Sequence, residues 1–291
     1  MEFTETELIY GRAGSVELQG LLYRPLNSPP LPIVIDIHGG AWSSGHLKSG
    51  GYYARKLAEA GICVLSINFR HGPKFHHPAA SADIAAAIRF VKSELGIAYS
   101  SLGLVGSSSG GHLSLYTSML PDIDAHSTTS ITMDGTLGIP TGVSAAVDFV
   151  IALWPVSDPI ARYLYVLARI RDGEETWGPM FTPDRLAQGH LAYFQTLEAM
   201  HQASIPRLLY AGEYQSLPRI LIVQPELDLN VPVFINQMLY GALLDIDADA
   251  TYELYTGVPH GFVREDSPQT RDCINSMIDF IKVSSSLTRQ C

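Results

Sequence analysis

Three serines lie between glycines in the sequence GLVGSSSGGHLS, residues 103–114. A serine becomes a useful nucleophile when a sharp strand-to-helix turn exposes its hydroxyl, and such a turn requires small residues two positions before and after it. Centring the turn on Ser108 places Gly106 and Gly110 at those positions, whereas centring it on either neighbouring serine places a larger residue there. The spacing therefore predicts Ser108 as the nucleophile.

The glycine–serine run alone has two other interpretations. Such runs often form plain turns, and a glycine-rich loop before a helix can bind phosphate. The segment lacks the lysine that a phosphate-binding P-loop carries, which disfavours the second interpretation. Chemistry at Ser108 therefore depends on partners elsewhere in the chain.

A serine nucleophile needs a base and a group that orients the base. Asp228 follows the apolar run RILIVQP, with Glu226 two residues before it, and His260 follows the next predicted strand in VPHGF. Carboxyl ends of parallel strands meet at one edge of a sheet, so we expect Ser108, Asp228 and His260 to converge there. The alternative for His260 is a surface loop histidine without a role.

The glycine-rich segment DIHGGAW, residues 36–42, follows another predicted strand. Backbone N–H groups aimed at a developing oxyanion stabilise the tetrahedral intermediate of acyl transfer. Gly40 and Ala41 present such groups without bulky side chains, and the N–H of Ser109 follows the nucleophile directly. We predict an oxyanion hole formed by Gly40, Ala41 and Ser109.

Further histidines lie outside this arrangement, at His38, His71, His76, His77, His112, His190 and His201. We expect His38, together with Trp42, to shape the glycine-rich loop. A metal site at residues 71–77 is disfavoured, because prolines constrain that segment and no acidic or cysteine ligand lies beside the histidines. No metal and no cofactor is expected.

Short apolar strands alternate with helical segments along most of the chain. Strands are predicted within 32–40, 62–70, 101–106, 143–155, 219–225 and 250–257, and helices within 51–61, 78–96, 110–120 and 270–283. Uniformly apolar strands that alternate with helices predict an α/β fold, with a mostly parallel central sheet and helices on both faces. Residues 5–12 and 16–24 predict an antiparallel hairpin at the N-terminal edge, with Gly11 and Gly14 in its turn.

Two segments interrupt this alternation within what we interpret as one domain, residues 1–291. Residues 121–142 are rich in Ser, Thr, Gly, Asp and Pro and predict a long loop at the end of the sheet opposite the serines. Residues 155–217 predict an inserted helical cap over the site, although extra helices packed on the core explain them equally well. The aromatic residues of this segment favour an aromatic or planar substrate; they are Tyr163, Tyr165, Trp177, Phe181, Tyr193 and Phe194.

Composition narrows the class of protein. The chain has 291 residues, 46% hydrophobic and 16% charged, with a formal net charge of −10. This composition disfavours disorder, and the acidic balance disfavours nucleic acid as a partner. Three cysteines without paired spacing favour a reducing compartment, and neither a signal peptide nor a membrane span is evident. We expect a cytoplasmic protein with a small-molecule substrate; a homodimer is one assembly that the sequence leaves open.

The combined motifs resemble the α/β-hydrolase superfamily, specifically the hormone-sensitive-lipase-like and feruloyl-esterase-like carboxylesterases. HGGAW is similar to the oxyanion loop of that family, GSSSGG to its nucleophile turn, and PELDLNVPV and PHGF to its acid and base loops. NFRHGPKFHHPAASAD, residues 68–83, is similar to a further family segment, in which Asp83 would be structural. The resemblance spans residues 32–283, leaves the cap and the 121–142 loop unmatched, and departs at Ala41 and Ser109, where the family often has glycine and alanine.

This resemblance implies a metal-free serine hydrolase that cleaves a carboxylic ester of a small, possibly aromatic, molecule through an acyl-enzyme. Because function resides in the site rather than in the scaffold, a formamidase, lactonase, acyltransferase or lyase using the same triad is the alternative. A non-catalytic ligand-binding relative is a third hypothesis. Such proteins usually lose a triad member, whereas all three are present here.

Overall fold

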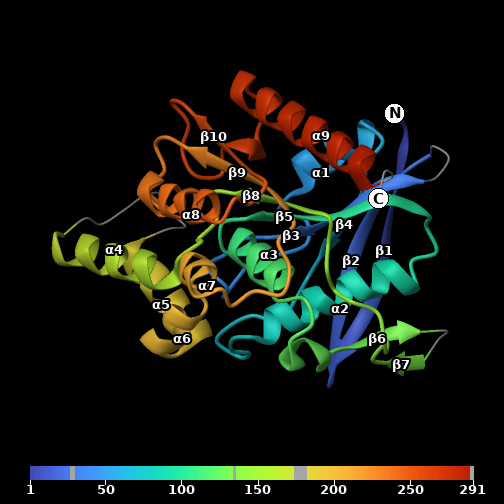
Figure 1. Ribbon diagram of the computed structural model, residues 1–291, viewed down its shortest axis with the longest axis horizontal. Coiled ribbons are helices and arrows are strands. Elements are labelled where there is room, and N and C mark those ends of the chain that lie inside the picture. Colours follow the sequence, from blue (N-terminus) through green and yellow to red (C-terminus); the bar gives the residue numbers. More distant parts are fainter. Residues whose placement is uncertain (27–29, 134–135, 174–181, 289–291) are drawn as a thin grey trace.

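One ten-stranded sheet forms the centre of the computed structural model, which describes residues 1–26, 30–133, 136–173 and 182–288 (Figure 1). Its strands are β1 (Phe3–Ala13), β2 (Val16–Pro25), β3 (Leu31–Ile37), β4 (Cys63–Ile67), β5 (Tyr99–Ser107), β6 (Ser130–Met133), β7 (Thr136–Gly138), β8 (Phe149–Leu153), β9 (Arg219–Pro225) and β10 (Ala250–Tyr255). The strand order is β10-β9-β8-β5-β3-β4-β2-β1-β6-β7. Neighbours from β10 to β4 pair in parallel, and those from β4 to β7 pair antiparallel. The predicted mostly parallel sheet with an antiparallel N-terminal edge is confirmed.

Helices cover both faces of this sheet, as the apolar strands require. α1 (Gly51–Glu59) and α9 (Pro268–Thr288) share one apolar core with the sheet, whereas α2 (Ala79–Ser93), α3 (Ser109–Met119) and α8 (Val233–Asp245) belong to the core on the other face (Figure 1). β4 and β8 are buried along their whole length. Strands buried on both faces place their carboxyl ends, and the loops that follow them, in fixed positions.

The hairpin at the N-terminal edge differs from the prediction at one residue. Gly14, with a φ of 60°, lies in the turn, but Gly11 lies inside β1 at a register shift opposite Leu18. A Cβ on Gly11 would lie 2.5 Å from the carbonyl oxygen of Ser130 on β6. Gly11 is therefore needed for close approach of a neighbouring strand rather than for the turn.

That neighbouring strand belongs to the stretch 121–142, which was expected to be a loop. The stretch contains the short helix η1 (Asp124–Ser127) and the strands β6 and β7, and β6 pairs with β1 at Gly11 and Arg12. Ile131 is fully buried, so a short apolar contact within a polar sequence suffices to add two strands to the sheet edge. The polar composition of the stretch concealed this pairing.

The described helices between β8 and β9 lie together outside the sheet (Figure 1): α4 (Pro159–Arg171), α5 (Pro183–Phe194), α6 (Leu197–Gln202) and α7 (Ile205–Ala211). Each begins after a Ser, Thr or Asp whose side chain accepts an N–H of the first turn. The caps are Asp158, Thr182, Thr196 and Ser204. None of the described helices is long and apolar enough to span a membrane.

Candidate active site

Ser108 occupies the sharp turn between β5 and α3. Its φ of 56° and ψ of −120° lie outside the regions that side chains adopt without strain. A Cβ on Gly106 would lie 2.3 Å from the Gly110 carbonyl oxygen, and one on Gly110 would lie 2.1 Å from the Ile37 carbonyl oxygen. Both flanking glycines are therefore required by close backbone contacts, which is the steric reason for which the sequence favoured Ser108.

Asp228 and His260 lie together at the carboxyl ends of β9 and β10. Oδ2 of Asp228 accepts a hydrogen bond from His260 Nδ1 at 2.7 Å, and its Oδ1 accepts the N–H groups of Asn230 and Val231 at 2.8 Å each. The Asp228 side chain is fully buried. Because the Asp228 carboxylate accepts this hydrogen bond, Nδ1 of His260 carries a proton, and Nε2 is the ring nitrogen that can act as a base. Glu226, the other acid near this position, is exposed and accepts the N–H of Gly257.

Ser108 and His260 flank the end of β8, which lies between β5 and β9 in the sheet. The N–H of Ser108 donates to the Leu153 carbonyl oxygen at 2.9 Å. The next residue, Trp154, packs its ring against the His260 ring with centroids 5.7 Å apart. The sheet thus brings the three predicted residues to one edge, with the Asp228–His260 hydrogen bond already formed.

The glycine-rich loop after β3 approaches the serine turn closely. A Cβ on Gly39 would lie 2.9 Å from the Ser107 carbonyl oxygen and 3.1 Å from Ser108 Cβ. Gly40 has a φ of 129° and Ala41 a φ of 51°, so the chain turns sharply at these residues. Among the described residues, none accepts a hydrogen bond from the N–H of Gly40, Ala41 or Ser109. These groups have the freedom that an oxyanion hole requires.

His38 and Trp42 flank residues 39–41 and fix the two ends of this loop through buried contacts. The His38 ring stacks on Phe69 with centroids 4.3 Å apart, and burial lowers its pKa to about 4. Trp42 Nε1 donates to His112 Nδ1 at 3.2 Å, and the His112 Nε2–H donates to the Ala203 carbonyl oxygen. Both residues are buried, so they shape the loop as expected.

The remaining sequence features lie in the framework around the site. The Asp83 carboxylate, within α2, accepts hydrogen bonds from the side chain and the N–H of Arg70 at 2.7 and 2.8 Å, and from the hydroxyl of Thr129 at 2.8 Å. His77 is packed among aromatic rings, and burial lowers its pKa to about 3. His76 donates from Nδ1 to the Ala192 carbonyl oxygen at 3.1 Å.

Described aromatic residues of the helical insertion belong mostly to the core. Tyr163, Tyr193 and Phe194 are buried, and the last two pack against Trp42. Tyr165 donates its hydroxyl to the Leu229 carbonyl oxygen. Trp177 and Phe181 lie outside the described residues. The described aromatic residues of the insertion therefore give no support to an aromatic substrate.

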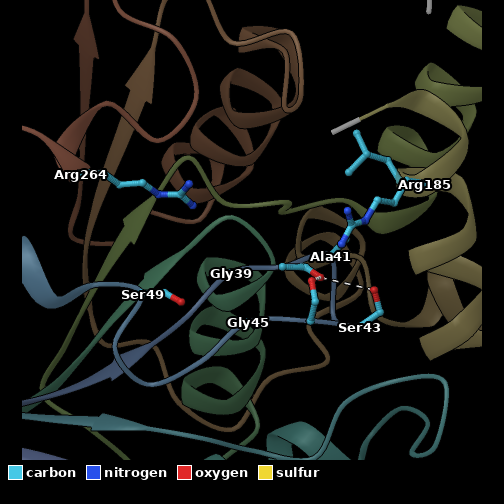
Figure 2. A pocket seen from close by; sticks show the side chains of 10 residues that line it. Gly39, Ala41, Ser43, Gly45, Ser49, Arg185 and Arg264 are labelled. Carbon is cyan, nitrogen blue, oxygen red and sulfur yellow. Dashed lines mark hydrogen bonds between the residues drawn. The ribbon is translucent and has the colours of Figure 1, made fainter. Parts of the chain in front are cut away.

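A cavity of about 310 Å³ lies on the glycine-rich loop, between α5 and η2 (Phe262–Arg264). Its described lining includes Gly40 and Ala41 but not Ser108, Asp228 or His260. Figure 2 shows Arg185 and Arg264 on opposite sides of this loop. α5 packs directly on the loop, since a Cβ on Gly189 would lie 2.9 Å from Ala41 Cβ.

Three arginines near the site were not predicted from the sequence. Arg162 of α4 is buried and donates from Nε to the Asn230 carbonyl oxygen at 3.1 Å and from its terminal nitrogen to Asn230 Oδ1. Burial lowers the pKa of Arg162 to about 9, while the Asp228 charge opposes this shift. The sequence patterns around Arg162 and Arg185 do not set these arginines apart from others in helices. Arg264, by contrast, lies four residues after His260, and this position beside the predicted base indicates it.

A model of the alpha/beta hydrolase fold family matches residues 34–264 of this chain. The chain belongs to the α/β-hydrolase family. The match covers the serine turn, Asp228, His260 and the glycine-rich loop of this α/β hydrolase, and the fold predicted by resemblance is confirmed.

Relatives of this α/β hydrolase carry names of esterases. A probable carboxylic ester hydrolase, LipM of Mycobacterium tuberculosis, is 32% identical over 39% of this chain and 27% of its own length. An arylesterase of Saccharolobus solfataricus is 32% identical over 36% of this chain and 35% of its own length. The aligned part thus spans about a third of these curated relatives.

A solved structure extends the likeness across the whole fold. The hyperthermophilic esterase of the archaeon Pyrobaculum calidifontis superimposes with a TM-score of 0.72, at 24% identity, over 97% of this chain and 85% of that chain. Identity at this level establishes the shared fold of the α/β hydrolase and nothing further.

Proposed function

We propose that this α/β hydrolase is a serine hydrolase that cleaves a carboxylic ester of a small molecule through an acyl-enzyme. The observation that carries the proposal is the Asp228–His260 hydrogen bond of 2.7 Å at the sheet edge where Ser108 lies on its strained turn. The esterase names of the relatives and the cavity of about 310 Å³, at the small end of ligand sites, support it.

The proposed reaction begins when His260 Nε2 accepts the hydroxyl proton of Ser108 as Oγ attacks the ester carbonyl carbon. Asp228 keeps the Nδ1 proton in place and stabilises the imidazolium that forms. The N–H groups of Gly40, Ala41 and Ser109 receive the negative charge on the former carbonyl oxygen.

Collapse of the tetrahedral intermediate breaks the ester C–O bond, and His260 donates its proton to the departing alcohol. Water then attacks the acyl-enzyme by the same route: His260 takes a proton from the water, and Ser108 leaves with a proton from His260. The products are the alcohol and the carboxylic acid, and the enzyme returns to its starting state.

The helices α4–α7 act as a cap in this proposal. The close packing of Gly189 on Ala41 supports this role, because it places α5 against the loop that holds the oxyanion. A cytoplasmic location remains a prediction of the sequence, and a homodimer is still one assembly that the sequence leaves open; the buried thiols of Cys63 and Cys273 are compatible with a reducing compartment.

Labelling with a fluorophosphonate probe, followed by a substrate panel, tests the proposal. The probe should modify Ser108 in wild-type protein and fail with Ser108→Ala. A panel of esters, formamides and lactones of matched size then ranks the reactions by kcat/KM. Preferential cleavage of formamide would replace the ester assignment, and absence of labelling in folded protein would favour the non-catalytic relative.

A further inference from the structure

The cavity on the glycine-rich loop combines two arginines with hydroxyl groups, and its described lining carries no carboxylate. Arg185 comes from α5 and Arg264 from η2, and serines at positions 43, 44 and 49 complete the polar part of the lining. Of the ten described lining residues, none is Asp or Glu. The described lining of this cavity is therefore positively charged, within a chain of net charge −10.

Neither arginine has a carboxylate partner within the described ranges of the chain. Arg185 and Arg264 form no ion pair there, whereas other exposed arginines do, such as Arg12 with Glu17 and Arg271 with Asp266. In an acidic protein, guanidinium groups without such partners beside a cavity attract anions to that cavity.

Figure 2 shows the guanidinium ends of Arg185 and Arg264 directed inward, toward the glycine-rich loop between them. Ser49 lies on the Arg264 side of the view, and Ala41 on the Arg185 side. The loop hydroxyls are partly engaged already: Ser43 and Ser44 both donate to the Gly40 carbonyl oxygen, at 3.4 and 3.0 Å. The arginines are therefore the charged donors among the described lining residues.

The cavity adjoins the proposed reacting centre along the glycine-rich loop. Gly39 lines it and also packs against the nucleophile, since a Cβ on Gly39 would lie 3.1 Å from Ser108 Cβ. Gly40 and Ala41 line it as well, so the proposed oxyanion donors and the arginines border one space. A small molecule whose carbonyl reaches the proposed oxyanion donors therefore shares this cavity with the two arginines.

We propose that Arg185 and Arg264 make this hydrolase selective for esters that carry a carboxylate in addition to the ester group. This inference rests on the proposed ester hydrolysis and specifies its substrate class. The planar guanidinium fork matches the two oxygens of a carboxylate, and such charge-assisted hydrogen bonds are stronger than neutral ones. The carboxylate is a binding group here and takes no part in bond breaking.

Matched esters test the inference on both sides of the ester bond. For the acyl side, the pair is 4-nitrophenyl hydrogen adipate and its methyl ester; for the alcohol side, it is 3-carboxyphenyl butyrate and its methyl ester. We expect at least one acid to exceed its methyl ester in kcat/KM by about 10-fold, mainly through KM, since the contact is present in both ground and transition states.

The variants assign that preference to the two side chains. The double variant Arg185→Gln/Arg264→Gln should reduce the ratio of kcat/KM for the acid to kcat/KM for its methyl ester to about 1. Each single variant should lose part of this preference. Arg12→Gln, on the distant hairpin of β1 and β2, is the matched control and should leave the ratio unchanged. Raising the salt concentration should lower the wild-type ratio, because exposed charges are screened.

The outcomes separate this inference from the ester proposal. Normal turnover of the neutral esters with ratios of 1 or below overturns the carboxylate preference and leaves ester hydrolysis intact. Should no ester be cleaved, calorimetry on Ser108→Ala with monomethyl and dimethyl adipate decides independently. Tighter binding of the monomethyl acid, lost in the double arginine variant, supports the anion site, and equal binding overturns it.

Discussion

The serine turn makes a quantitative prediction about stability. Ser108 has a φ of 56° and a ψ of −120°, a conformation that glycine adopts freely and other residues do not. Residues held in such regions cost about 1–3 kcal/mol, and the cost persists where the surroundings fix the backbone. Here the N–H of Ser108 donates to Leu153, and its carbonyl oxygen accepts the N–H groups of His112 and Val156.

The comparison of Ser108→Gly with Ser108→Ala isolates that strain. Both variants remove the nucleophile, but only glycine removes the Cβ that causes the strain. Glycine also increases the entropy of the unfolded chain, which costs about 0.4–1 kcal/mol. Ser108→Gly should therefore exceed Ser108→Ala in free energy of unfolding by about 0.5–2 kcal/mol, the strain released less the entropic cost.

Equilibrium unfolding in urea measures the difference, provided that the slope of free energy against urea is the same for both variants. Ester turnover should fall by about 10⁴-fold or more in both. Equal stability of the two variants would refute the strain argument. Turnover near the wild-type level in Ser108→Ala would refute the role of Ser108.

Three further predictions concern the supporting residues. Asp228→Asn should lower kcat by about 10³–10⁴-fold without loss of fold, since an amide no longer fixes the Nδ1 proton of His260; steady-state kinetics and circular dichroism check this. Arg162→Met should lower the free energy of unfolding by about 1–3 kcal/mol, because both oxygens of Asn230 lose a buried donor; a similar stability in urea would contradict it. Burial raises the pKa of Asp36 to about 6. Between about pH 4 and pH 6 the folded protein therefore binds more protons than the unfolded chain, and the Asp36 contribution to the free energy of unfolding is lost as pH rises through that window. Asp36→Asn should remove this component from urea unfolding measured at pH 4 to 7, and an unaltered pH dependence would contradict the assignment.

The positions of Ser108, Asp228 and His260 at one edge of the sheet could be predicted from the sequence, because local steric rules and chain order determine them. Only Ser108 has glycine two residues before and after it, and the contacts of Gly106 and Gly110 show why that matters. Asp228 and His260 followed from the rule that parallel strands collect their carboxyl ends at one edge. Such rules depend on chain order rather than on distant packing.

Features that depend on contacts between distant segments were not accessible in this way. The strand β6 forms because Ile131 finds a buried position beside Gly11, a contact between segments far apart in the chain that polar composition concealed. The aromatic residues of the insertion favoured an aromatic or planar substrate in the sequence, but Tyr193 and Phe194 pack on Trp42 in the core. Periodicity indicates which residues are apolar, and only tertiary packing determines what they face.

The hydrogen bonds of Arg162 tie the helical insertion to the acid loop. Its guanidinium extends from α4 and binds Asn230, whose own N–H helps to hold Asp228. A variant in which different helices replace α4–α7 therefore needs a cation equivalent to Arg162, or a redesigned turn after β9. Otherwise a change intended for substrate scope would disturb the carboxylate on which the proposed proton transfer relies.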